Sequence, residues 1–353
     1  VMDDLLEEIA PLPRHDISTF IKAGMDQDNE TLKKAPQAMR DFFDESLNPP
    51  PDWVDYDAFL PGIRSFQRNS PTILAAFVAG TLINGFTTLI SKSFVQTGRI
   101  FDNGVWRLRQ NNRHMIEIFW PGGLTRQGDG WKLSVRIRFA HGQIRRLLAQ
   151  TSEWDHEALG VPVSAAHMGF AVANFSSQTL LHAQRLGARF TAEERVGYLA
   201  VWRYSGYLMG VPETLLYRDE GEAQRMYDLG RICEPPPTTD SILMTNALIN
   251  SAPLVAGIED KKERESLVHN VIYPVSRALV GKATADQLRF PRGKQLGTLF
   301  FFRLGQRIDH LKGRLLRKPP TNFASLIGAS AYSEYGIAYN LPDHPHAERS
   351  SPW

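Results

Sequence analysis

The sequence predicts an all-α fold, and three observations support this prediction. Apolar residues recur at a period of about 3.6 over most of the chain, strict alternation of apolar and polar residues is scarce, and there are no internal repeats. Signals for the start of a helix also precede apolar patterns: Ser164 is a good N-cap, and "TAEE" at 191–194 is a capping box. A short strand at "HMIEIFW" (114–120) stays open as an alternative.

Prolines divide the chain into an N-terminal arm and a larger helical domain. Residues 16–45 have helical periodicity with an interruption near "GMDQDN", and the proline-rich segment 47–56 favours neither helix nor strand. We therefore expect a helical arm with its linker over residues 1–56, a main helical domain over 57–320, and an irregular C-terminal tail over 321–353.

Helices are expected one after another along the main domain. Glycine and proline separate them, as in the loop "WPGGLTRQGDGW" and at Gly187, where a helix should stop. The expected helices cover 71–95, about 104–119, about 131–150, 164–186 and 191–209, and after the proline break "EPPP" helical pattern runs from 240 to about 317.

The first of these helices contains the most apolar run of the chain, "PTILAAFVAGTLINGFTTLI" (71–90), which carries no charge over a length that could cross a bilayer. Asn84 and four threonines lower its hydropathy, which favours a buried core helix, and membrane association stays the alternative. The first residues, "VMDDLLEEIAPLPRHD", are acidic and do not resemble a secretory leader. We therefore expect a cytoplasmic or peripherally membrane-associated protein.

Composition and motifs exclude several classes of function. The chain has 40 basic and 38 acidic residues, so its net charge of +2 gives no general attraction to nucleic acid. The single cysteine, Cys233, cannot form an intramolecular disulfide, and we expect it to be buried as a small apolar side chain. The sequence has no HExxH zinc motif, P-loop, dinucleotide-binding glycine pattern or GxSxG nucleophile elbow.

The histidines are scattered, and most of them are expected to be capped or surface side chains. This expectation covers His156, His167, His182 and His269. His141 is different because it lies in the amphipathic segment "VRIRFAHGQIRRLLAQ" (135–150). At about 100° per residue, Arg138 and Arg145 lie within about 60° of His141 on one side, about 10.5 Å apart along the axis. The apolar flank on the other side is Ile137, Ile144 and Leu148.

This helix face has the chemistry that haem b requires. Haem b is a flat apolar macrocycle with a central iron and two carboxylates on one edge, so it needs an imidazole ligand, an aliphatic wall and cationic side chains. The alternative is a core histidine bonded to a backbone carbonyl, with arginines that extend to solvent.

Several segments resemble one known family. They are "VRIRFAHGQIRRLL", Trp154, "GVPVS" at 160–164, "FSSQTL" at 175–180 and "YLAVWRYSGYLMGVP" at 198–212. They are similar to the family of the latex clearing proteins (rubber oxygenases) and the fungal oxygenase of mycophenolic acid biosynthesis, over roughly residues 60–285. The resemblance implies an all-α fold with a globin-like core and additional terminal helices, a b-type haem, and oxidation of isoprenoid carbon–carbon double bonds with O₂.

The resemblance also assigns residues to the haem. His141 matches the proximal iron ligand of the family, and Arg138 and Arg145 match the arginines beside it. "YPVSRALVG" at 273–281 resembles a late Pro-x-x-Arg segment, which makes Arg277 a further candidate for the same pocket.

The distal side of the haem departs from the family pattern. Latex clearing proteins have an Arg-x-x-Lys-Thr motif there, whereas this chain has "RLRQN", with Arg107, Gln110 and Asn111 at the corresponding positions. These three residues would share one helix face with His114, and a solvated face is the alternative. Glutamine cannot replace lysine as a strong iron ligand, so the iron should be open to O₂, with Arg107, Gln110 and Asn111 as hydrogen-bond donors. The family's proposed catalytic carboxylate has no counterpart motif here.

The sequence therefore predicts a haem b-dependent oxygenase that oxidises, and cleaves, a double bond of a hydrophobic isoprenoid-like small molecule or polymer. Its partners would be this substrate, O₂ and an electron donor. Two alternatives remain. One is a haem protein for gas binding or electron transfer, with His114 as a second axial ligand. The other is a haem-free helical protein that binds lipid or associates with a membrane.

Overall fold

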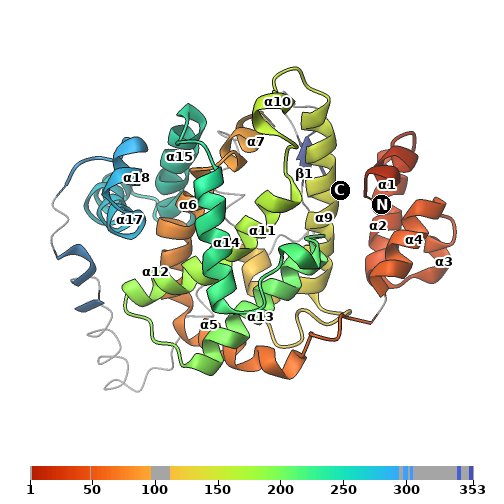
Figure 1. The fold of residues 1–353 in the computed structure, drawn as a ribbon, viewed down its shortest axis with the longest axis horizontal. Coiled ribbons are helices and arrows are strands. Elements are labelled where there is room, and N and C mark those ends of the chain that lie inside the picture. Colours follow the sequence, from red (N-terminus) through yellow and green to blue (C-terminus); the bar gives the residue numbers. More distant parts are fainter. Residues whose placement is uncertain are drawn as a thin grey trace.

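The computed structural model describes residues 2–47, 49–96, 112–293, 297–300, 303–304, 340–342 and 350–352. Most of them are helical (Figure 1), and the predicted all-α class is confirmed. The N-terminal arm contains α1 (Met2–Ile9), α2 (Arg14–Asp26), α3 (Asn29–Leu32) and α4 (Gln37–Leu47).

The main domain continues the helical pattern as far as residue 287. Its first half contains α5 (Tyr56–Ala76), the π-helical turn η1 (Phe77–Thr81), α6 (Leu82–Phe86), α7 (Ile90–Gln96), a helix over residues 112–118, α9 (Asp129–Ala149) and α10 (His156–Leu159). Its second half contains α11 (Ala165–Ala173), the π-helical turn η2 (Asn174–Gln178), α12 (Thr179–Arg185), α13 (Ala192–Leu208), η3 (Glu213–Leu215), α14 (Glu220–Cys233), α15 (Thr239–Val255), α16 (Lys261–Leu267), η4 (Val268–Ile272), α17 (Tyr273–Val280) and α18 (Lys282–Gln287).

Two glycines allow α5 and α13 to pack closely, in the lower part of the view in Figure 1. A Cβ atom added at Gly62 would lie 2.2 Å from the backbone nitrogen of Tyr198, and one added at Gly197 would lie 2.7 Å from the carbonyl oxygen of Ala58. Only hydrogen atoms on both Cα positions fit at this crossing, which gives two glycines in helix interiors a packing role.

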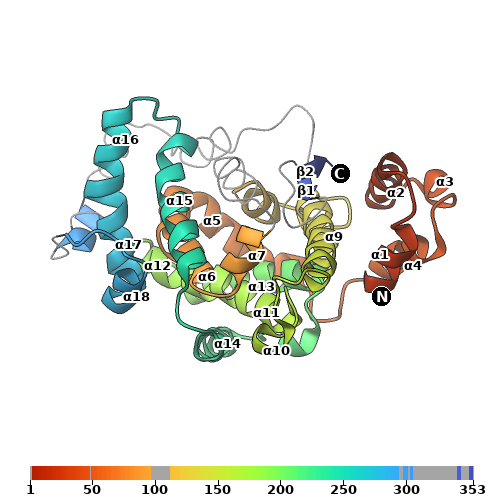
Figure 2. The ribbon, with the colours of Figure 1, turned by 90° about the horizontal axis from the view of Figure 1, so that it is seen from above.

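The N-terminal arm packs on one side of α9, and α13 packs along another side of it (Figures 1 and 2). Phe42 of α4 meets Phe139 of α9 edge to face, with 4.7 Å between ring centroids. Gly142 contacts Met2 of α1, and Lys132 forms an ion pair of 2.6 Å with Asp26. The apolar contacts explain why α9 has buried residues on more than one face.

The structure corrects the expected start of the helix at residue 71. The helix begins at Tyr56 because the Asp55 carboxylate caps it, accepting the N–H of Asp57 at 2.9 Å. The two prolines inside α5 do not end it: the backbone departs from helical geometry at Asn69, just before Pro71. None of residues 49–55 is helical, which agrees with the predicted proline-rich linker.

The apolar run 71–90 is largely buried among the other helices. Within the described ranges, no single helix is both long and apolar enough to span a membrane. One pair, Tyr56–Phe86 with Ile90–Gln96, passes that test by length and composition only, and it is bent by 84°.

Two further expectations can be compared with the described residues. The segment from His114 to Ile118 is helical, so the strand alternative there is wrong. In the tail, β1 (Asn340–Pro342) pairs antiparallel with β2 (Ser350–Pro352). This pairing corrects the expectation that the whole tail is irregular. The division into 1–56, 57–320 and 321–353 stays a prediction.

Candidate functional site

Helix α9 carries the candidate haem ligand. The helix runs from Asp129 to Ala149, close to the predicted 131–150, and His141 lies on it half-buried. Leu148 of the predicted apolar flank is fully buried. Ser134, two turns before His141, points in nearly the same direction because seven residues complete about two helical turns.

Arg145, one turn after His141, binds a loop. Its Nε and Nη2 atoms donate to the carbonyl oxygen of Val163 at 3.2 and 2.9 Å, and Nη2 also lies 3.8 Å from the Met168 sulfur. Val163 has a φ of 47°, a left-handed conformation that is unfavourable for a β-branched residue. The guanidinium therefore helps to fix a strained backbone beside α9.

Arg138, one turn before His141, has a different environment. Its guanidinium carbon lies 5.0 Å from the centre of the Phe42 ring. Burial lowers the pKa of Arg138, while Glu45 and Tyr207 nearby oppose this shift. Among the described residues, no carboxylate lies within ion-pair distance of this guanidinium. It is thus a partly buried cation without an anion in contact.

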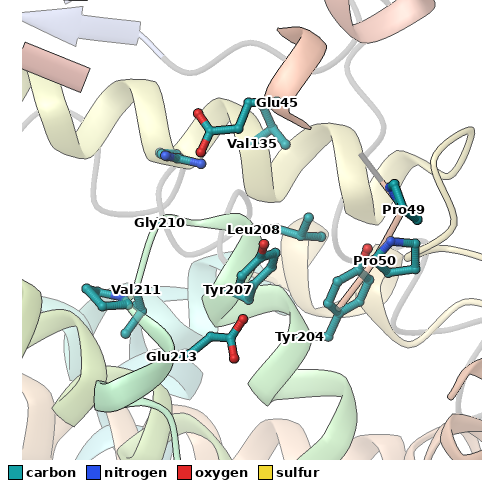
Figure 3. A pocket seen from close by; sticks show the side chains of 12 residues that line it. Glu45, Pro49, Pro50, Val135, Tyr204, Tyr207, Leu208, Gly210, Val211 and Glu213 are labelled. Atoms are coloured by element: carbon teal, nitrogen blue, oxygen red, sulfur yellow. The ribbon is translucent and has the colours of Figure 1, made fainter. Parts of the chain in front are cut away.

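Arg138 also lines a pocket of about 200 Å³ between α4, α9 and the end of α13 (Figure 3). Figure 3 shows the Glu45 carboxylate on one side of the pocket and the Tyr204 and Tyr207 rings on the other. Gly210 has a φ of 88°, and a Cβ atom there would lie 2.8 Å from Arg138 Nε. The other lining residues are Pro49, Pro50, Val135, Leu208, Val211, Pro212 and Glu213.

His114 is a second imidazole near His141. It is buried, and its Nε2 atom lies 3.1 Å from the Ser134 hydroxyl of α9 and 3.3 Å from the Ser205 hydroxyl of α13. Burial, and secondarily the neighbouring His141, lower the pKa of His114 to about 3, so its ring is neutral at pH 7. Among the four residues of the predicted distal face, the structure describes His114, and its ring points toward α9.

The remaining predicted site residues are Arg107, Gln110, Asn111 and Arg277. Arg107, Gln110 and Asn111 lie outside the described residues. Arg277 is almost fully buried in α17, where it donates to Asp286 at 2.6 Å and to the carbonyl oxygen of Phe290 at 3.1 Å. Helices α17 and α9 lie on opposite sides of the molecule in both views (Figures 1 and 2), so the structure does not place Arg277 beside His141.

The structure corrects two expectations about other reactive side chains. His182 is a core histidine and neither a capped nor a surface one: it is 2% exposed, its Nε2 lies 3.2 Å from the Asn84 amide, and burial lowers its pKa to about 3. Cys233 is exposed, because it is the last residue of α14 and lies beside the exposed Ile232. His156 and His269 are surface residues as expected.

Sequence reasoning did not find the partners of these side chains. Ser134 and Ser205 lie on helices 71 residues apart in sequence, and their contact with each other at 3.0 Å depends on how α9 packs on α13. Glu45 belongs to the arm, and no sequence signal connects it to Arg138. Small polar residues on otherwise apolar helix faces were the available signal for the two serines.

Comparison with known proteins gives one family and one structure. Residues 64–308 match the model of a family described as "ER-bound oxygenase mpaB/B'/Rubber oxygenase, catalytic domain". A solved structure, "Structure of Latex Clearing Protein LCP in the closed state", is similar with a TM-score of 0.67 and 18% sequence identity, covering 88% of this chain and 84% of that chain. This likeness shows the fold alone. No curated protein matches the chain by sequence.

Proposed function

Since the chain belongs to the family of mpaB-type and rubber oxygenase catalytic domains, we propose that it is a haem b-dependent oxygenase that cleaves a carbon–carbon double bond of a hydrophobic isoprenoid-like substrate with O₂. The observation that supports this best is one face of α9, where His141 lies between two arginines. When bound, haem b supplies the iron at which O₂ reacts.

The residues present fit this cofactor. Haem b needs cationic partners for its two propionates, and the Arg138 guanidinium is a partly buried cation in a pocket that Glu45 also lines. Among the described residues, no carboxylate lies within ion-pair distance of this guanidinium. A partly buried cation gains from a directly bonded carboxylate, so a propionate bound there would stabilise the site. His141 would hold the iron, and Arg138 would bind a propionate.

Arg145 can contribute as well, although it already holds Val163. A guanidinium has five N–H donors, and two of its nitrogens contact the Val163 carbonyl. The remaining donors can bind a carboxylate oxygen while the loop stays in place. Arg145 would therefore orient the cofactor and the loop at the same time.

The hydrogen bonds of His114 bear on whether it would hold the iron. Its Nε2 atom is engaged by the hydroxyls of Ser134 and Ser205, so the proposal assigns iron binding to His141 and not to that nitrogen. Arg107, Gln110 and Asn111 stay the proposed donors on the O₂ side. A hydrophobic substrate offers few groups for hydrogen bonding, so shape and burial would select it. A separate electron donor would keep the iron reduced.

Reconstitution with haemin tests this proposal. The purified full chain should develop a Soret band, the reduced protein should bind carbon monoxide, and incubation with a polyisoprenoid alkene under O₂ should give carbonyl products that react with a hydrazine reagent. His141→Ala should lose the Soret band, whereas His156→Ala, at an exposed histidine, should keep it. An undiminished Soret band in His141→Ala would remove the ligand assignment, and carbon monoxide binding without carbonyl products would leave a haem protein of another function.

A further inference from the structure

Three polar side chains from two helices form a hydrogen-bonded chain beside the loop that Arg145 holds. The Ser164 hydroxyl lies 2.8 Å from His167 Nδ1, and His167 Nε2 lies 2.7 Å from Glu234 Oε1. Ser164 and His167 belong to the start of α11, and Glu234 follows α14. We infer that this is a nucleophilic serine site that transfers small acyl groups from esters to water.

The hydrogen bonds determine where the protons are. Glu234 Oε2 accepts the backbone N–H of Leu89 at 2.8 Å, and the Glu234 side chain is 8% exposed, so the carboxylate is held in one orientation. A carboxylate only accepts, so the tautomer with its proton on His167 Nε2 donates to Glu234. In that tautomer the Nδ1 lone pair accepts the proton of the Ser164 hydroxyl. This is the nucleophile–base–carboxylate order of serine hydrolases, with the two ring nitrogens exchanged.

Helix capping alone does not account for this arrangement. As the N-cap of α11, the Ser164 hydroxyl oxygen accepts the backbone N–H of His167 at 3.2 Å, and this contact needs neither the imidazole nor Glu234. The imidazole and the carboxylate add a base and its orienting group to a hydroxyl that is already fixed. The preceding residue, Val163, holds its φ of 47° through the Arg145 hydrogen bonds, so the position of Ser164 is defined from both sides.

Backbone N–H groups near Ser164 can stabilise the negative charge that develops on the carbonyl oxygen during acyl transfer. The N–H groups of Ala165 and Ala166 lie in the first turn of α11, where helix geometry gives them no intrahelical acceptor, and they point out of its positive end. Ala166 and Val161 are exposed, and Ser164 and His167 are half-buried, so a small ester can approach from solvent.

The reaction balances without any further reagent. Ser164 Oγ would attack the ester carbonyl carbon while its proton moves to His167 Nδ1, and the Ala165 and Ala166 N–H groups would stabilise the oxyanion. The carbon–oxygen bond to the leaving alcohol then breaks, and the alcohol takes the proton from His167. Water, activated by the same imidazole, would hydrolyse the acyl-serine to a carboxylic acid and restore Ser164.

The test uses the full-length chain with a fluorophosphonate probe and with p-nitrophenyl acetate. We expect the probe to label Ser164, identified by mass spectrometry of the labelled peptide. Ser164→Asn keeps a good N-cap but removes the nucleophile, and His167→Gln removes the base, so each should lower the hydrolysis rate by about 100-fold or more. Ser266→Asn, at an exposed serine, is the matched control and should hydrolyse the ester as the unchanged chain does.

Circular dichroism verifies that the variants fold, and Ser164→Cys gives a second measurement. A thiol next to the same base should react with iodoacetamide faster than the exposed Cys233 of the same chain. Labelling at another residue, or equal ester hydrolysis by the unchanged chain and Ser164→Asn, would overturn the inference. Neither measurement depends on haem, so its result is independent of the proposed oxygenase activity.

Discussion

Acid should destabilise the haem-free protein through its two buried imidazoles, His114 and His182. Both are at most 6% exposed, and burial lowers the pKa of each to about 3 from an ordinary value of 6.5. The unfolded chain therefore binds two more protons than the folded chain between these values. The contribution of the two neutral histidines to the free energy of unfolding is complete above pH 6.5, the pKa in the unfolded chain. It begins to fall as the pH drops through 6.5 and continues to fall until the pH reaches the pKa in the folded chain, near 3.

The size of the effect follows from the pKa difference. A pH of 5 is about 1.5 units below the pKa of a histidine in the unfolded chain, and each unit is worth about 1.4 kcal/mol. Each buried histidine should therefore lower the free energy of unfolding by about 2 kcal/mol at pH 5 relative to pH 7. The two together should cost about 4 kcal/mol, a large part of the stability of an ordinary domain.

Urea unfolding at pH 7 and pH 5 measures this difference. His182→Gln should be less stable than the unchanged chain at both pH values, but it should lose about 2 kcal/mol less between them, because one buried proton site is gone. His156→Gln, at an exposed histidine, should show the pH dependence of the unchanged chain. If His182→Gln lost as much stability as the unchanged chain between the two pH values, the argument from burial would be wrong.

Three substitutions test other parts of the argument. Gly62→Ala should lower the free energy of unfolding by roughly 2 kcal/mol, because its Cβ atom would lie 2.2 Å from the backbone of Tyr198. The control Gly221→Ala in α14 should not lower it. Equal urea midpoints for Gly62→Ala and the unchanged chain would contradict the close crossing of α5 and α13. Val163→Gly should raise the free energy of unfolding by about 1 kcal/mol through relief of its positive φ, and a destabilised variant would show that the backbone is not strained. Gln110→Lys adds an amine ligand on the predicted distal face, so the haem-loaded spectrum should become low-spin, and an unchanged spectrum would argue against that face.

Local signals in the sequence were sufficient for several elements. The capping box is present as predicted, with Glu194 N–H donating to the Thr191 hydroxyl at 3.2 Å and Thr191 N–H donating to the Glu194 carboxylate at 3.0 Å. Periodicity placed α9 to within two residues at its start. These predictions held because the interactions join residues three or four positions apart, which a sequence shows directly.

Features that depend on tertiary packing could not be read in this way. A histidine in "TLLHAQR" does not reveal that His182 will lie against Gly80, where a Cβ atom would be 2.6 Å from its ring. Cysteine is commonly buried, but whether Cys233 is buried depends on which helices pack against the end of α14, and there it is exposed. Ser164 was predicted as a cap, and its contact with the Glu234–His167 pair follows from the packing of α14 on α11.

The same limit applies to the candidate site, where the sequence placed Arg138 and Arg145 on one helix face but could not give their partners. Arg145 donates to Val163, next to Ser164, whereas Arg138 lies over Phe42 in the pocket. The two arginines are equivalent in the pattern and differ in the structure, so their substitution should have different consequences.

Arg138→Met should weaken haemin binding about 10-fold, the loss of roughly one charge-assisted hydrogen bond, and leave fluorophosphonate labelling of Ser164 unchanged. Arg145→Met should weaken haemin binding by a similar factor and also slow the labelling, because Val163 would no longer be held at its positive φ. Haemin titration followed at the Soret band and labelling rates on the same preparations separate the two effects. If both variants changed both measurements equally, the guanidinium of Arg145 would not couple the loop to the face of α9, and the distinction drawn between the two arginines would be wrong.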